Sequence, residues 1–279
     1  MRTLGRALRH LPGAVGFTVV AFWVLIAVFA PLVAPYDPLK SQVPLVMPFG
    51  AGPDGARFWL GTDMLGRDIL SRLIWGTRTV VIYATVSTSC AYIVGISAGL
   101  AAGFFRGWID RVLSFGANVM LSFPVLVIYL LIIVTLGPSG VNIVLAVTFA
   151  SAPAIFRIVR ALTLDIRSRD FVAAAITQGE SSLRIMLGDI LPNATGPLIV
   201  DACLRVGYTA IAIGTLGFLG LGLPPPTPDW GGMVNEGRAM AIVFPHLVIF
   251  PCIAISSLML GLSMLADGLR EAARAGARG

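Results

Sequence analysis

Few residues of this chain have the types and spacing that catalysis requires. The two histidines, His10 and His246, are too few for a histidine-based metal cluster within one chain. The three cysteines are scattered singly through apolar runs without a Cys-x-x-Cys spacing, which favours packing over redox chemistry. The single lysine, Lys40, follows no glycine-rich loop and forms no phosphate-binding motif. The sequence therefore predicts no catalytic residue, no metal site and no cofactor bound by this chain.

Two groups of charged residues stand out against this apolar background. Asp201 and Arg205 lie one helical turn apart in a stretch where unpaired charges are costly. We expect them to pair or to extend towards the polar boundary of the membrane, with a role in gating as the alternative. In the segment Gly61-Thr62-Asp63 the carboxylate can accept N–H groups of a turn. Asp68 lies four residues before Arg72, which is the spacing of an ion pair on a helix.

The composition is that of a membrane protein. Of 279 residues, 57% are apolar and 12% are charged, about half the charged fraction usual for a soluble domain. The mean hydropathy of +0.88 leaves too little polar surface to cover a water-soluble core. The net charge of +6 raises the question of nucleic-acid binding, but the arginines form no patch interleaved with aromatic residues. We therefore expect a lipid bilayer, and no nucleic acid, as the partner of this surface.

Charge-free stretches set the organisation, because crossing a bilayer takes about 20 apolar residues. One stretch is too long for a single span, and the turn signal Gly137-Pro138-Ser139-Gly140 divides it in two. The sequence predicts an all-α integral membrane protein with six transmembrane helices. The stretches are residues 11–36, 79–105, 112–156, 206–228 and 239–266.

The second stretch carries a repeated glycine. Gly95, Gly99 and Gly103 recur at every fourth residue and so lie on one face of a helix. This face carries no polar group, so we expect it to pack closely against another helix.

Basic residues indicate how the spans are oriented. If the N-terminus is cytoplasmic, thirteen of the 20 Lys and Arg residues lie on the cytoplasmic side and six on the outer side. The positive-inside rule then places both termini in the cytoplasm. The first stretch is long and carries Pro31 and Pro35 where a signal peptide would be cleaved, so we interpret it as a retained anchor.

Unequal connections divide the chain into three parts. Residues 1–36 form a tail and the first span, residues 37–78 an external loop with a surface helix, and residues 79–279 a five-helix core. The core includes a long cytoplasmic loop, residues 157–195. Long loops on a rigid scaffold often carry function, so we expect both loops to matter.

Capping signals predict a short helical hairpin in the cytoplasmic loop. Ser168 is expected at the N-cap of a first helix and Gly179 at its end, and Ser181 or Ser182 caps a second helix that ends at Pro192. The first helix is unusually apolar for a solvated element. It either packs on the protein's own spans or docks in a groove of a soluble partner.

This loop resembles the EAA signature of binding-protein-dependent ABC importer permeases. In that signature a small-residue helix, a glycine and a later Leu-Pro mark the loop that sits on the ATPase. The match here consists of Ala173-Ala174-Ala175, Gly179 and Ile190-Leu191-Pro192-Asn193, with Ala173 where the signature has an acid. The resemblance implies that the following residues couple to the ATPase: Phe171, Val172, Ala173, Ala174, Ala175, Gly179, Leu191 and Pro192.

A second match narrows the branch. Residues 59–73 resemble the loop before the second span in dipeptide, oligopeptide and nickel permeases, and specifically in the second of their two paired subunits. Residues 34–38, 217–231 and 267–272 match the same branch in order. The loop is then either a platform for an external substrate-delivery protein or a solvated turn with an amphipathic helix on the membrane surface. The candidate residues are Gly61, Thr62, Asp63, Gly66, Arg67 and Asp68.

The resemblance implies a type I ABC importer permease fold in a bacterial inner membrane. A homologous permease would complete the translocation pathway, two cytoplasmic ATPases would bind ATP and Mg, and an extracytoplasmic solute-binding protein would deliver a peptide, nickel chelate or related small solute. The alternative is a self-contained secondary transporter or channel. That class needs polar groups near mid-membrane, and the predicted spans offer almost none beyond Asp201 and Arg205.

Overall fold

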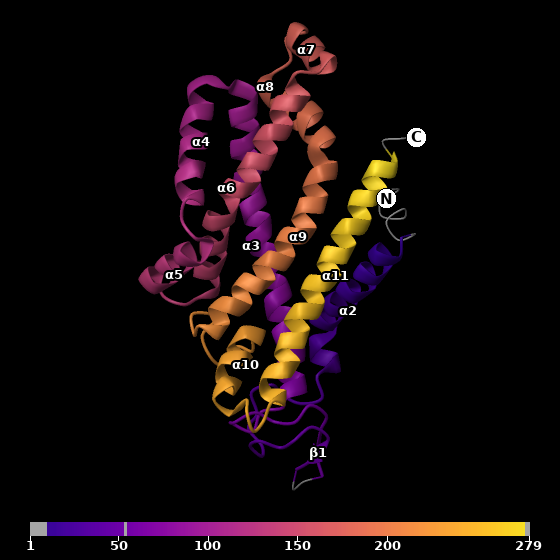
Figure 1. Ribbon diagram of the computed structural model, residues 1–279, viewed down its shortest axis with the longest axis vertical. Helices are drawn as coiled ribbons and strands as arrows, with labels where there is room; N and C mark the ends of the chain where they lie inside the picture. The colour runs from indigo at the N-terminus through magenta and orange to yellow at the C-terminus, as the bar shows by residue number, and fades with distance from the viewer. Residues whose placement is uncertain (1–9, 53–54, 277–279) are drawn as a thin grey trace.

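The computed structural model describes residues 10–52 and 55–276 of the chain. Within these ranges, five helical segments are long and apolar enough to cross a membrane, and a bent pair brings the number to six. The five run along the long axis of the molecule (Figure 1). They are α2 (Leu11–Val33), α3 (Ile69–Phe105), α6 (Gly140–Arg167), the segment Ser182–Phe218 and α11 (His246–Gly276). The all-α membrane fold is therefore confirmed.

The remaining crossing is not the single straight helix that we expected. Helices α4 (Gly107–Leu121) and α5 (Val125–Leu136) meet at an angle of 88°. The break falls at Pro124, which has no backbone N–H for the helix ladder and restricts the residue before it. The predicted turn after α5 is confirmed, since Ser139 accepts the Asn142 N–H at 3.2 Å and so caps α6.

The fifth span begins earlier than predicted. Helix α8 (Ser182–Arg184), the π-helical turn η1 (Ile185–Ile190) and α9 (Leu191–Phe218) run on without interruption. Pro192, expected to end a separate helix, lies directly after the π-helical turn as the second residue of α9 and does not interrupt the helical run. The second helix of the predicted hairpin is therefore the first part of the span.

The second span also begins earlier. Helix α3 starts at Ile69 and is continuous to Phe105, so the helix that we expected on the membrane surface within residues 37–78 is the first part of this span. On the same side, α10 (Trp230–Gly237) and the 3-10 turn η2 (Arg238–Met240) connect α9 to α11, which starts only at His246.

The glycine face of α3 packs against α6. A Cβ atom built on Gly95 would lie 2.6 Å from the Ile155 Cγ2, and one on Gly99 would lie 2.6 Å from the Val159 Cβ. Gly103 meets Thr163 in the same way. The predicted packing role is confirmed, because any larger side chain would force the two helices apart.

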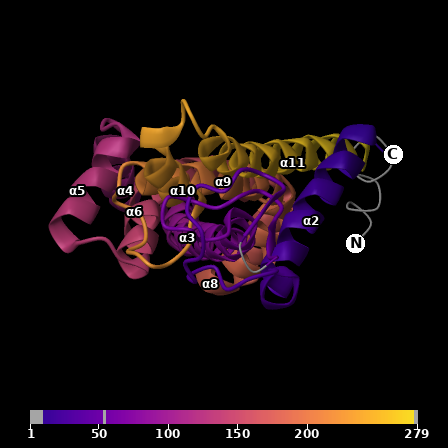
Figure 2. The same cartoon turned by 90° about the horizontal axis from the view of Figure 1, so that it is seen from below.

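The two ends of the bundle carry different structures. Helix α7 (Asp170–Thr177) lies at one end, and the C-terminal part of α11 points towards the same end, while α2 begins nearer the middle of the long axis (Figure 1). Helix α10 and the antiparallel strands β1 (Gly50–Ala51) and β2 (Arg57–Phe58) lie at the opposite end. Seen along the bundle, α5 and α2 lie on opposite sides with α3, α9 and α10 between them (Figure 2).

Candidate functional sites at the two ends of the bundle

Helix α7 begins one residue later than its sequence signals indicate. Its N-cap is Arg169, and not Ser168 as predicted. Ser168 still has helical dihedral angles and ends α6, where its hydroxyl donates to the Asp165 carbonyl at 2.7 Å. The chain becomes extended only at Arg169, so only there can a new helix be capped.

The end of α7 is as predicted. Gly179 has a φ of +77°, a conformation that favours glycine. Its N–H donates to the Ile176 carbonyl and the Glu180 N–H donates to the Ala175 carbonyl, both at 3.1 Å, which is a Schellman motif. Ser181, one of the two predicted alternatives, then caps α8.

Helix α7 has a buried face and an exposed face. Val172 is completely buried and belongs to the apolar cluster formed by α3, α6, η1 and α9. Phe171 and Ile176, in contrast, are 43% and 46% exposed. Leu191 packs partly against the same cluster, and Pro192 is exposed. The self-packing interpretation therefore holds for the buried face, and docking on a partner stays a prediction for the exposed face. The other exposed residues of this site are Ala173, Ala174 and Gly179.

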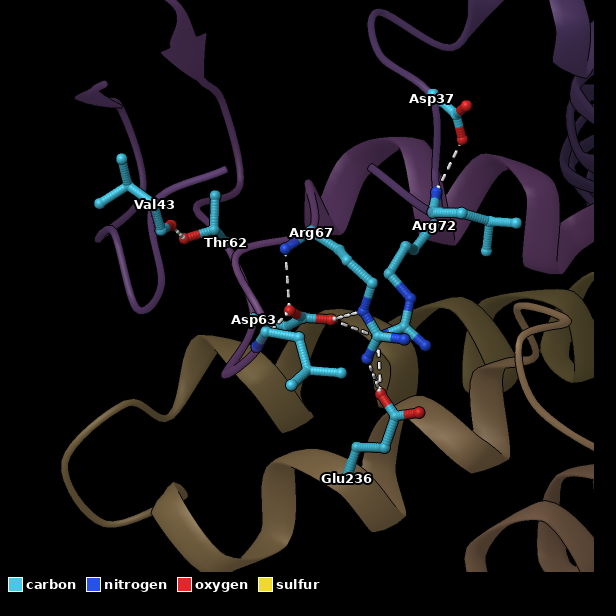
Figure 3. Close-up of polar contacts among 9 residues, drawn as sticks. Asp37, Val43, Thr62, Asp63, Arg67, Arg72 and Glu236 are labelled. Atoms are coloured by element: carbon cyan, nitrogen blue, oxygen red, sulfur yellow. Dashed lines mark hydrogen bonds and ion pairs between the residues drawn. The ribbon is translucent and has the colours of Figure 1, made fainter. Parts of the chain in front are cut away.

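At the opposite end, the loop that precedes α3 is held by Thr62. Its hydroxyl donates to the Val43 carbonyl at 2.6 Å and accepts the Val46 N–H at 2.9 Å (Figure 3). Gly66 has a φ of +78°, and a Cβ there would lie 2.8 Å from the Gln42 carbonyl oxygen. The backbone of residues 42–46 therefore fits only against a glycine at this position.

Asp63 lies at the centre of an ion-pair cluster. Its Oδ1 accepts the N–H groups of Leu65 and Arg67 at 2.8 and 2.9 Å, which confirms the predicted turn. Its Oδ2 accepts Arg67 Nε at 2.7 Å and Arg72 Nη1 at 2.5 Å. Glu236 of α10 completes the cluster, because its Oε2 accepts Arg67 Nη2 at 2.7 Å and Arg72 Nη1 at 2.6 Å (Figure 3). The outer cluster, as we call these four residues, joins the loop and α3 to α10.

The predicted ion pair between Asp68 and Arg72 is wrong. Asp68 is the N-cap of α3, and its Oδ2 accepts the Ser71 N–H at 2.8 Å and the Ser71 hydroxyl at 2.6 Å. The other carboxylate oxygen is buried without a hydrogen-bond partner among the described residues. Burial raises the pKa of the Asp68 carboxyl above its usual value, although the bonds from Ser71 oppose the shift.

Helix α10 is held in place by its N-cap Asp229 and by Trp230. Asp229 is its N-cap and accepts the Gly232 N–H at 2.8 Å, and burial raises the pKa of its carboxyl. Trp230 is completely buried, donates its indole N–H to the Leu73 carbonyl at 3.0 Å and packs edge-to-face with Trp23. Through Trp230, α10 is attached to both α3 and α2.

Two cavities flank the outer cluster. The larger has a volume of about 340 Å³ and an apolar lining, and the smaller has a volume of about 200 Å³ and a more polar lining. Both are lined by Arg67, Arg72, Pro225 and Glu236. The two guanidinium groups and the Glu236 carboxylate therefore form a common wall.

Within the spans, Asp201 and Arg205 form the predicted pair. Arg205 Nε lies 2.6 Å from Asp201 Oδ2, and the Tyr92 hydroxyl of α3 donates to the same oxygen at 2.5 Å. The contribution of Tyr92 had no signal in the sequence, because it lies 109 residues away from Asp201. Across the described part of the chain, no group of three or more His, Cys, Asp or Glu side chains could hold a metal ion.

Comparison with known proteins places this architecture in a family. Residues 91–278 match the family described as "Binding-protein-dependent transport system inner membrane component", and residues 3–48 match the "N-terminal TM domain of oligopeptide transport permease C". The glutathione transport system permease protein GsiD of Pectobacterium atrosepticum is 35% identical over 95% of this chain and 86% of its own length. The dipeptide transport system permease proteins DppC of Alkalihalophilus pseudofirmus and Haemophilus influenzae are 36% and 37% identical over 92% of this chain and over 84% and 88% of their own lengths. The chain therefore belongs to the family of binding-protein-dependent transport system inner membrane components, the permease subunits of ABC importers.

Proposed function

We propose that this chain is one of two different permease subunits that together form the pathway of an importer for peptides or related small solutes, including glutathione-like compounds or nickel chelates. The printed names of its relatives, which are dipeptide and glutathione permeases, support this substrate class. ATP and Mg are bound by two separate cytoplasmic ATPases. An extracytoplasmic solute-binding protein delivers the solute to the end of the bundle that carries α10.

The two-faced geometry of α7 carries the proposal. Val172 fixes α7 to the apolar cluster beneath it, while Phe171 remains exposed on the surface of the helix. An exposed aromatic residue on a firmly anchored helix is suited to insert into a groove of a soluble partner. Because η1 and α9 belong to the same cluster, a force on α7 is transmitted to a membrane span.

The proposal also sets the orientation and the location. The α7 end lies in the cytoplasm of a bacterial cell, with both termini on that side of the inner membrane, in line with the distribution of basic residues. The exposed coupling residues are Phe171, Ala173, Ala174, Gly179 and Pro192, while Val172, Ala175 and Leu191 support them from below.

Replacement of Phe171 tests the coupling role. Phe171→Glu places a charge on the docking face, so the variant should lose co-purification of the ATPases and uptake of solute while its membrane abundance stays normal. Phe171→Leu keeps an apolar side chain and should retain most of both activities. If Phe171→Glu kept full ATPase association, the coupling assignment would be wrong.

Gly179→Arg gives a second test on the same helix. A Cβ at Gly179 meets no atom of the described residues within 4 Å, so the arginine has room at its base, and the cost is the strain of a positive φ, about 1–2 kcal/mol. The variant should accumulate in the membrane but block the approach of a partner. Disappearance of the protein from the membrane would favour a purely structural role for this turn.

A further inference from the structure

The outer cluster already contains a carboxylate held by two buried guanidinium groups. The side chains of Arg67 and Arg72 are only 9% and 4% exposed, whereas that of Glu236 is 39% exposed. Buried cations require partners, so the position of the Glu236 Oε2 is a preformed carboxylate site. Glu236 is the cluster member that comes from another element, at a sequence separation of 164 residues from Arg72.

Glu236 is also the member that is held least. Asp63 accepts two backbone N–H groups in addition to both arginines, and so it is fixed by its own loop. Glu236 contributes a single oxygen, with one bond from each arginine. Arg72 remains incompletely satisfied in this arrangement, because its buried Nε has no partner among the residues described here.

The adjoining cavities provide room for more than a carboxylate. The larger cavity's volume of about 340 Å³ lies at the lower end of the range of small-molecule sites, about 300–1,000 Å³. Apart from the outer cluster, its walls are mainly apolar. The smaller cavity of about 200 Å³ offers glycine backbone and polar side chains. The apolar walls are Met64, Leu65, Ile69, Met233 and Leu247, and the polar side chains are Thr227, Asp229 and Asn235.

We propose that these cavities form a binding site for a small solute with a free carboxylate, which takes the place of the Glu236 carboxylate between Arg67 and Arg72. An apolar group of the solute occupies the larger cavity. When Glu236 leaves, the two guanidinium groups keep side-chain hydrogen bonds only to the Asp63 carboxylate among the described residues, and the vacated donors of Arg67 and Arg72 attract the ligand carboxylate. The solute class rests on the proposed function, in which peptides and related acids reach this end of the bundle first.

In this arrangement Glu236 acts as an internal competitor. The apparent affinity for a ligand is the intrinsic affinity multiplied by the fraction of molecules in which Glu236 does not occupy the site. Neutralising Glu236 therefore strengthens binding, which is the reverse of what the loss of a structural ion pair would do. This opposite sign separates the binding role from a purely structural one.

The test uses the assembled importer in lipid nanodiscs without its solute-binding protein, titrated calorimetrically with the dipeptide alanyl-leucine and with its C-terminal amide. Glu236→Gln should bind the free acid about tenfold more tightly than the unaltered complex and should bind the amide no better. Glu236→Ala serves as a second neutral variant if Gln impairs assembly. Adding Arg67→Gln to either variant should abolish the gain. Glu271→Gln, the same change at the opposite end of the molecule, should leave binding unchanged.

Three results would overturn the inference. The first is equal binding of the free acid and the amide, and the second is no gain in dipeptide affinity in either neutral variant. The third is that the neutral variants bind only the solute-binding protein more tightly and not the dipeptide, which would mean that the Glu236 carboxylate acts on that protein. Uptake of the same dipeptide by the complete importer separates the two proposals. Uptake without a binding gain refutes only this site, whereas a gain without uptake of any peptide refutes only the proposed substrate class.

Discussion

At the scale of single residues, burial decides which charged groups the fold can hold. Asp68 is nearly inaccessible, and one of its oxygens has no hydrogen-bond partner among the described residues, yet its other oxygen caps the start of α3. Its neighbour Asp63, also buried, is fully bonded by two arginines and two N–H groups. The two acids therefore differ in how completely the fold bonds their oxygens, and burial raises the pKa of the Asp68 carboxyl.

Replacement of Asp68 by Asn should make the effect of burial on this carboxyl measurable. The pKa of the carboxyl is raised in the folded protein above the 3.8 of its unfolded reference, so the folded state binds the proton more tightly and loses stability as pH rises through its folded pKa. Asn keeps an acceptor for the Ser71 N–H and carries no charge. The melting temperature of Asp68→Asn relative to the unaltered protein should therefore rise with pH above about 4. A difference that is constant with pH would contradict the assignment.

At the scale of elements, α3 and α6 approach closely because the glycines leave room. At Gly99, an added Cβ would lie 2.6 Å from the Val159 Cβ, whereas at Gly116 of α4 it would meet nothing within 4 Å. The two positions thus form a matched pair of helical glycines with opposite surroundings.

Alanine at these two positions should have effects of opposite sign. Gly99→Ala overpacks the interface and should lower the free energy of unfolding by about 1–3 kcal/mol. Gly116→Ala gains helix propensity and should raise it by up to about 1 kcal/mol. Thermal unfolding of the purified protein in detergent checks both. Equal changes in the free energy of unfolding for the two variants would mean that α3 and α6 can move apart to accept a methyl group without loss of stability.

The anchoring of α7 leads to a separate expectation. Val172 is completely buried, so Val172→Ala should cost about 1–2 kcal/mol through the lost methyl groups and the cavity that they leave. Half-exposed Phe171 should contribute little to stability and much to ATPase association. Melting temperature and co-purification, measured for both alanine variants, should therefore rank the two residues in opposite orders.

Sequence reasoning found what depends on local spacing and missed what depends on long-range contacts. The turn at Asp63, the stop at Gly179 and the glycine face of α3 are encoded within a few residues, and all three are confirmed. Glu236 and Tyr92 join their partners across 164 and 109 residues, and no periodicity links them. The Asp68 error arose because the carboxylate has two candidate partners in adjacent positions: it caps the N–H of Ser71 three residues on, and the predicted partner Arg72 lies four residues on.

At the scale of the whole molecule, the assignment of sides rests on charge. In a background without Cys90, Cys203 and Cys252, an impermeant thiol reagent should label Gly55→Cys in intact cells. Ser182→Cys should react only after the membrane is opened, because the basic residues place the α7 end inside. Labelling of Ser182→Cys from outside would reverse the orientation of the bundle.

The length of the fifth span has a consequence for the surrounding lipid. The segment Ser182–Phe218 has 37 residues, and at 1.5 Å per residue it is about 55 Å long, against about 30 Å of hydrocarbon. We expect the first part of the segment, which carries Arg184 and Asp189, to extend beyond the hydrocarbon and to hold α7 away from it. A thicker or thinner membrane therefore shifts its boundary along this helix, and hydrophobic mismatch is absorbed without moving the docking face.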